Sequence, residues 1–89
     1  MKKRQKKTSN RYKNEEYLIA LGEHCRKLRT KAGYSVNRMT KEGEQLSPDV
    51  INRLESGSGA VTVLSIARYA DILGLHPKKL LDFSFDFNE

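Results

Sequence analysis

The sequence predicts a single all-α domain of five helices, and three observations support this class. Apolar residues recur at helical spacing along the first half of the chain. Capping residues and glycine stops divide the middle of the chain into short segments. Strict alternation of apolar and polar residues, the signal of a strand, begins only in the last residues. We therefore expect a basic arm over 1–13, a helical domain over 14–81 and a tail over 82–89.

The first predicted helix begins after Asn14, a suitable N-cap, and ends before Gly33. Its apolar residues follow one another at steps of 3, 4, 3 and 4, which is the period of an amphipathic helix. They are Leu18, Leu21, Cys25, Leu28 and Ala32. Because Cys25 lies on this stripe, we interpret it as a small core residue and not as a nucleophile.

A short second helix is expected after Ser35, which can cap it. Its inward candidates are Val36, Met39 and Thr40, and the segment 43–45 breaks it. A fourth helix begins after the cap Thr62 and ends at Gly74. Its apolar residues are Val63, Ile66, Ala67, Ala70 and Leu73. A short fifth helix opens at His76 and Pro77 and has Leu80 and Leu81 inward.

The third helix, 48–56, has both ends marked. Ser47 is a suitable N-cap, Pro48 suits the first helical position, and Gly57 is a C-terminal stop. The inward face comprises Ile51, Leu54 and Glu55, and the opposite face is polar, with Asp49, Asn52, Arg53 and Ser56. A short helix with such a polar face fits the major groove of DNA. The plainer interpretation is an ordinary amphipathic surface helix.

The tail changes to the period of a strand, because Phe83, Phe85 and Phe87 alternate with polar residues. Three phenylalanines on one face are too apolar to leave in water. We expect first that the tail pairs as a strand with the tail of a second chain, which gives a homodimer. The alternatives are packing of the rings on their own domain and a disordered tail.

The net charge of +6 is concentrated in the arm. Residues 1–13 contain seven lysines and arginines and no acid, so +6 less +7 leaves −1 for the rest of the chain. Such a segment is expected to be disordered in the free protein. Its lysines, among them Lys3 and Lys6, are candidates for contacts with DNA phosphates or the minor groove, although a solubilising tail is the plainer interpretation.

Several other functions are not supported by the composition. One cysteine excludes an intrachain disulfide, and no cluster of cysteines and histidines has metal-ligand spacing. No carboxylate pair or glycine-rich phosphate loop indicates catalysis, so we expect neither an enzyme nor a cofactor or metal. No apolar run approaches the roughly 20 residues that span a bilayer. We therefore expect a cytoplasmic protein with no membrane contact.

The spacing of many elements resembles the lambda-repressor-like (Xre-type) helix-turn-helix domains. The matching elements lie between about 21 and 81 and are Leu21-Gly22, the run 25–29, Gly33-Tyr34-Ser35, Met39-Thr40, the run 51–57, the run 70–75 and Leu80-Leu81. The resemblance implies an all-α domain that binds double-stranded operator DNA as a dimer, with the third helix in the major groove. It also implies a structural ion pair between Arg29 and Glu55 that locks the first helix to the third.

The chain departs from this family in the helix-turn-helix region. Val36 stands where the family usually has a polar residue that touches a phosphate, and Thr40 replaces a smaller residue that faces the turn. The turn over 43–46 is one residue longer than the family's. Val61 replaces the proline that usually precedes the fourth helix.

Arg53 is the first candidate for base recognition, because a guanidinium can donate two hydrogen bonds to guanine. Asp49, one turn earlier, can support Arg53 or accept from cytosine, and Asn52 suits adenine or a phosphate. A plain surface ion pair is the alternative for Asp49 and Arg53. By the resemblance, the further phosphate-contact candidates are Asn37, Arg38, Ser47 and Ser58.

The function predicted from these features is that of a sequence-specific DNA-binding transcriptional regulator. One alternative is an antitoxin that binds its own promoter and neutralises a toxin partner. Another is a protein-interaction module of the same fold, which the nearly neutral domain and Val36 are compatible with. A third is nonspecific RNA binding through the arm.

Overall fold

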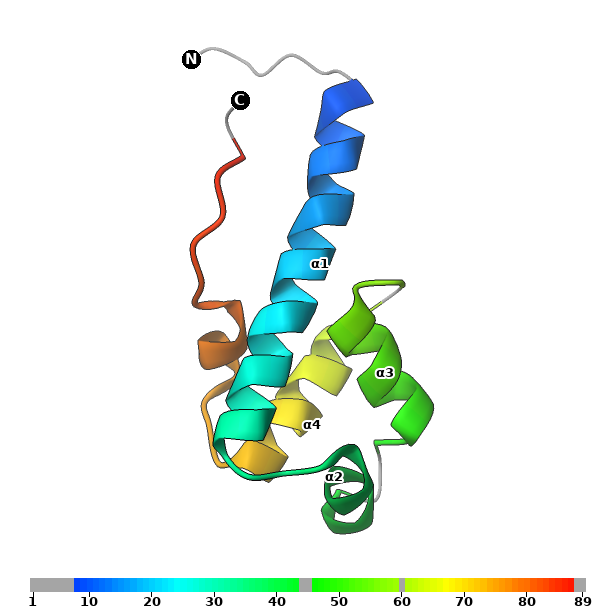
Figure 1. Ribbon diagram of the computed structural model, residues 1–89, viewed down its shortest axis with the longest axis vertical. Helices are drawn as coiled ribbons and strands as arrows, with labels where there is room; N and C mark the ends of the chain where they lie inside the picture. The colour runs from blue at the N-terminus through cyan, green and yellow to red at the C-terminus, as the bar shows by residue number, and fades with distance from the viewer. Residues whose placement is uncertain (1–7, 44–45, 60, 88–89) are drawn as a thin grey trace.

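Four α-helices and one short 3-10 helix make up the part of the chain that the computed structural model describes, residues 8–43, 46–59 and 61–87. They are α1 (Thr8–Lys31), α2 (Val36–Glu42), α3 (Pro48–Ser56), α4 (Val63–Leu73) and the 3-10 helix η1 (Pro77–Leu81). No strand occurs within these ranges. The short elements gather around the C-terminal half of α1, and its N-terminal half projects beyond them (Figure 1). The all-α class is therefore confirmed.

The first helix is longer than the sequence predicted. It begins at Thr8, so Asn14 lies inside α1 and is not its N-cap. The predicted boundary between arm and domain therefore falls within a helix. Residues 8–13 are helical, so the predicted disorder of the arm is wrong for them. Residues 1–7, which include Lys3 and Lys6, lie outside the described residues, and their predicted disorder stays a prediction.

The caps predicted for the later helices are confirmed. In each, the cap side chain accepts a hydrogen bond from a backbone N–H two or three residues further on, which satisfies a donor that the helix leaves unpaired. These caps are Ser35, Ser47, Thr62 and His76. The helices α3 and α4 end at Gly57 and Gly74, whose φ angles of 71° and 74° lie in the left-handed region that favours glycine.

Every helical element contributes to one core. Its fully enclosed side chains are Leu21, Cys25, Met39, Leu46, Ile51, Leu54, Tyr69, Ala70 and Leu80. The core roles predicted for Cys25 and Met39 are thus confirmed. Three inward assignments were wrong: Val63 is 83% exposed, Leu81 is 47% exposed, and Ala32, which follows the last residue of α1, is also exposed. Val63 lies in the first turn of α4, which faces solvent, and the fifth element is a 3-10 turn, whose geometry turns Leu80 inward and leaves Leu81 outside.

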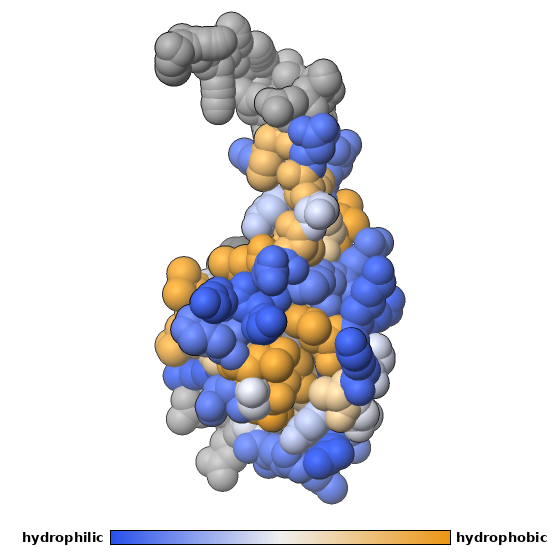
Figure 2. All heavy atoms as spheres, turned by 90° about the vertical axis from the view of Figure 1, so that its left-hand side faces the viewer, coloured by the Kyte–Doolittle hydropathy of each residue, from blue (hydrophilic) through white to orange (hydrophobic). Residues whose placement is uncertain are grey.

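The tail folds back along α1, and residues 82–87 form no strand. The ring of Tyr17 lies 5.2 Å from that of Phe83 and 5.3 Å from those of Phe85 and Phe87, measured between centroids. Figure 1 shows the tail running beside the projecting half of α1, and Figure 2 shows apolar surface on both this projection and the body below it. This arrangement is the intrachain packing that the sequence left as an alternative. The strand-paired homodimer stays a prediction.

The backbones of α1 and α3 touch at Gly22. A Cβ atom added to Gly22 would lie 2.4 Å from the Glu55 carbonyl oxygen and 2.5 Å from that of Leu54. No real Cβ comes that close to backbone, so a side chain at this position would force the two helices apart. The absence of a side chain at Gly22 therefore sets the distance between α1 and α3.

We expect Gly22→Ala to lower the free energy of unfolding by about 1–3 kcal/mol or more, because the methyl group overpacks a rigid contact. This outcome opposes the gain in helix propensity of about 1 kcal/mol that replacing glycine by alanine normally brings. Gly59→Ala is the matched control, since an added Cβ meets nothing within 4 Å there. Thermal unfolding followed by circular dichroism measures both. A Gly22→Ala protein that melts at or above the wild type contradicts the close contact.

Candidate nucleic-acid interface

Helix α3 presents its polar face to solvent. Ile51 and Leu54 are 0% and 1% exposed, so the apolar side of the helix is buried in the core. The opposite face, as predicted, is exposed and comprises Asp49, Asn52, Arg53 and Ser56. The structure therefore brings together on one helix face the residues that the sequence assigned to base reading.

Arg53 is paired on this face with Asp49. Their Nη2 and Oδ2 atoms are 3.1 Å apart, and the side chains are 60% and 69% exposed. A pair so exposed contributes only about 0.3–0.5 kcal/mol to a helix. The guanidinium has five N–H donors, and one contact with Asp49 leaves most of them available to an incoming ligand. The pair thus orients Arg53 without using up its hydrogen-bonding capacity.

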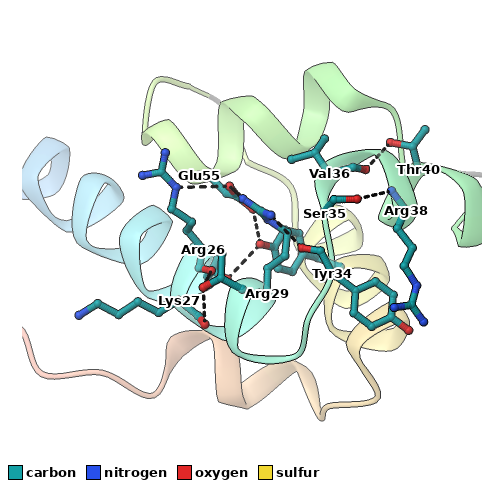
Figure 3. A network of polar contacts seen from close by, with 12 residues as sticks. Arg26, Lys27, Arg29, Tyr34, Ser35, Val36, Arg38, Thr40 and Glu55 are labelled. Carbon is teal, nitrogen blue, oxygen red and sulfur yellow. Dashed lines mark hydrogen bonds and ion pairs between the residues drawn. The ribbon is translucent and has the colours of Figure 1, made fainter.

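A buried ion pair fixes α3 to α1. Arg29 donates from Nε to Glu55 Oε2 at 2.6 Å and from Nη2 to Glu55 Oε1 at 2.8 Å, and the two side chains are 11% and 7% exposed. Arg29 Nη1 also donates to the carbonyl oxygen of Tyr34 at 2.9 Å, which holds the connection between α1 and α2 (Figure 3). The ion pair that the family resemblance implied is present, and it fixes the position of α3 on α1.

Tyr69 of α4 completes this network, and no pattern in the sequence pointed to it. Its hydroxyl lies within hydrogen-bond distance of Glu55 Oε2 and 3.0 Å from the carbonyl oxygen of Cys25. A hydroxyl has one proton to donate, and the charged carboxylate is the stronger acceptor. Glu55 therefore accepts from both α1 and α4, so three helices meet at one carboxylate.

The pKa values of Glu55's partners are shifted so that both keep their protons. The hydrogen bond to Glu55 raises the pKa of Arg29. Burial, followed by the hydrogen bond to Glu55, raises the pKa of Tyr69. At neutral pH the carboxylate is thus faced by a cation and by a neutral hydroxyl that can donate.

Arg38 contacts residues of its own region, Glu42 and Tyr34, instead of the face of α3 that carries Arg53. Its Nε donates to Glu42 Oε2 at 2.9 Å, and its guanidinium carbon lies 4.1 Å from the ring centroid of Tyr34. The Tyr34 hydroxyl donates to Glu42 Oε1 at 3.0 Å, so the three side chains form a closed cluster. Figure 3 shows Arg38 directed from α2 away from α3. The hydrogen bonds from Arg38 and then from Tyr34 lower the pKa of the Glu42 carboxyl.

The other predicted phosphate contacts lie at helix ends. Ser47 Oγ accepts from Val50 N at 3.2 Å as the cap of α3, and Ser58 Oγ lies 2.9 Å from Ser56 Oγ in the loop after that helix. Asn37 is exposed on α2. Val36, where the family resemblance leads one to expect a polar residue, is half-buried. The hydroxyl of Thr40 donates to the Val36 carbonyl at 2.9 Å, so this bulkier residue satisfies its own polar group.

A small hollow lies beside Arg53 between α3 and α4. It measures about 40 Å³ and is lined by Val50, Arg53, Leu54, Val61 and Ser65. Pockets for small molecules are roughly ten times larger. Among the described residues, no group of three or more histidine, cysteine, aspartate or glutamate side chains is placed to hold a metal ion. No helix in the described ranges is both long and apolar enough to cross a membrane.

Comparison with known proteins gives no relative: no protein-family model, no curated protein and no solved structure matches this chain.

We expect Arg29→Ala to lower the free energy of unfolding by about 3–5 kcal/mol, because it leaves a buried carboxylate without its cation. Arg26→Ala is the control. Its Nε lies 3.9 Å from the same carboxylate, but its side chain is 65% exposed, so the loss should stay below about 1 kcal/mol. Denaturant unfolding measures both variants. Equal losses in the two variants would show that the buried pair has no special role.

We expect the protein to lose stability as the pH rises from about 9 to about 12. Burial, with the nearby Glu55 charge, raises the pKa of Cys25 from 9.0 to about 12. The unfolded chain therefore releases this proton at a lower pH than the folded chain, so alkali favours unfolding across that window. Denaturant unfolding at stepwise higher pH tests this. Cys25→Ala should decline less steeply than the wild type, and an identical pH profile would refute the assignment.

Proposed function

We propose that this chain is a sequence-specific DNA-binding transcriptional regulator in which α2 and α3 act as a helix-turn-helix unit. In this proposal α3 enters the major groove and α2 lies against the DNA backbone. The observation that carries it is the exposed polar face of α3, held on a helix whose other face is locked in the core. The resemblance to lambda-repressor-like domains supports the same assignment.

The dimensions of α3 suit this role. An α-helix with its side chains is about 10–12 Å across, which fits a major groove about 12 Å wide, and the nine residues of α3 make a helix about 14 Å long. Its exposed side chains include the three types that read bases well, arginine, asparagine and aspartate. In this proposal Arg53 donates to guanine, and its ion pair with Asp49 supports that role by holding the orientation of the guanidinium. We therefore assign Arg53 the main role in recognition.

The positive charge of the chain is distributed unevenly between the α2–α3 surface and the N-terminal residues 1–13. The exposed arginines of α2 and α3 each face an acid, Arg38 with Glu42 and Arg53 with Asp49, so this surface has little excess positive charge. The seven positive charges of residues 1–13 supply what the helices lack. We infer that α3 provides sequence preference and the N-terminal segment provides most of the salt-dependent affinity.

A protein-interaction module is the second candidate, and one observation favours it. Val63 and Leu64 open α4 side by side and are 83% and 55% exposed. Apolar side chains that adjoin one another on an exposed surface are a feature of protein interfaces. An antitoxin would combine both roles, with α3 on DNA and an apolar surface on its partner.

Selection of binding sites from random duplex DNA, followed by Arg53→Ala, tests the main proposal. We expect one enriched sequence, and a loss of about 1–3 kcal/mol with relaxed preference at one base position in the variant. Lys27→Ala is the charge-matched control on α1 and should leave the preference unchanged. An Arg53→Ala protein with the wild-type base preference would refute the role of α3. Failure to enrich any sequence would favour the protein-interaction module.

A further inference from the structure

The hollow beside Arg53 adjoins the polar face of α3. It lies between α3 and the residues at the start of α4. Val50 and Arg53 line it from α3, and because they are three residues apart they are neighbours on the same side of the helix. Arg53 also belongs to the exposed polar face, with a side chain that is 60% exposed. A ligand held on this face by Arg53 therefore lies next to the hollow.

The wall of the hollow is apolar apart from Arg53 and Ser65. Its apolar side chains are Val50, Leu54 and Val61. The Ser65 hydroxyl donates to the Thr62 carbonyl oxygen at 2.9 Å, so its one proton is used within the first turn of α4. A buried water typically makes about three hydrogen bonds. With the Ser65 proton used and the other walls apolar, the hollow suits an apolar group better than a water molecule.

The volume of the hollow limits which apolar group can enter. One water molecule takes about 30 Å³ of the liquid, and a methyl group is of similar size. A hollow of about 40 Å³ therefore accepts one methyl group and no ring. In the major groove of unmodified DNA, the methyl group is that of thymine, at its C5 atom. The hollow thus matches this group in both size and polarity.

We propose that the hollow binds the C5 methyl group of a thymine close to the base that Arg53 reads. This inference rests on the proposed function. 5-Methylcytosine carries the same methyl group, but at C4 thymine presents an acceptor and cytosine a donor. Because Arg53 only donates hydrogen bonds, thymine is favoured beside it. Val50, which has no hydrogen-bonding side chain, is then a specificity-determining residue.

The position of the thymine follows from the spacing of Val50 and Arg53 on α3. Side chains three residues apart on a helix have Cβ atoms about 5–6 Å apart. Successive base pairs of the duplex are about 3.4 Å apart. The methyl group should therefore lie within about two base pairs of the base that Arg53 reads.

Exchange of thymine for uracil in the selected duplex tests the inference, because it removes the methyl group and nothing else. Each thymine is replaced in turn, and binding of the full chain is measured by fluorescence anisotropy. At one thymine, within about two base pairs of the position that Arg53→Ala relaxes, uracil should weaken binding about fourfold, which is the effect of one buried methyl-sized group. 5-Methylcytosine at that position should not restore the affinity. If it does, the assignment to thymine is wrong.

The ratio of the thymine affinity to the uracil affinity shows whether the hollow is the cause. In Val50→Ala, which removes part of the wall, we expect this ratio to fall from about four to below about two. Val63→Ala is the matched control, because Val63 is 83% exposed and lies outside the residues that line the hollow, and it should keep the wild-type ratio. Both duplexes are measured on the same protein, so partial unfolding of a variant leaves the ratio unchanged.

The outcomes distinguish failure of this inference from failure of the proposed function. If uracil weakens binding at no position near the base that Arg53 reads, the inference is wrong although the proposed function stands. The same holds if Val50→Ala keeps the wild-type ratio, or if Val63→Ala lowers it equally. If selection enriches no sequence, the proposed function and this inference fail together.

Discussion

The carboxylate of Glu55 is the point on which the arrangement of the helices depends. It accepts two hydrogen bonds from Arg29 and lies within reach of the Tyr69 hydroxyl, so α1, α3 and α4 are joined at one charge. Arg29 extends the connection to the backbone at Tyr34, at the start of α2. A buried charge is tolerated only when its partners are held in place, and here the partners come from α1 and α4. The ion pair therefore specifies one relative position of the helices more than it adds to stability.

The close contact of α1 with α3 depends on the same region of the chain. Gly22 allows the two backbones to touch beside Glu55, and Gly57 allows the end of α3 to pass against Ile19, where an added Cβ would lie 2.6 Å from a backbone atom. The polar face of α3 therefore belongs to a helix that is held rigidly against α1. A recognition surface gains from such rigidity, because little conformational entropy is lost when the ligand binds.

Local features of the fold were predictable from the sequence, whereas features that depend on distant contacts were not. The caps at Ser35, Ser47 and Thr62 follow from local hydrogen bonding, and the two faces of α3 follow from helical periodicity. The start of α1 was predicted too late in the chain, and the tail, more than sixty residues away, contacts this helix at Lys13, before the predicted cap. Tyr69 was missed because its role depends on Glu55 and Cys25, and the exposure of Val63 depends on how α4 meets its neighbours. In the candidate interface, periodicity placed Arg53 and Asp49 correctly, but the position of Arg38 depends on Tyr34 and Glu42.

The enclosure of Cys25 has a practical consequence for handling the protein. Its thiol is 0% exposed and lies in the core between α1 and the helices packed on it, and it is the one cysteine of the chain. Two natively folded copies cannot bring these sulfur atoms within bonding distance of each other. A disulfide-linked species on a non-reducing gel would therefore identify molecules that had opened during purification or storage. The same thiol can serve as a built-in label for counting such openings.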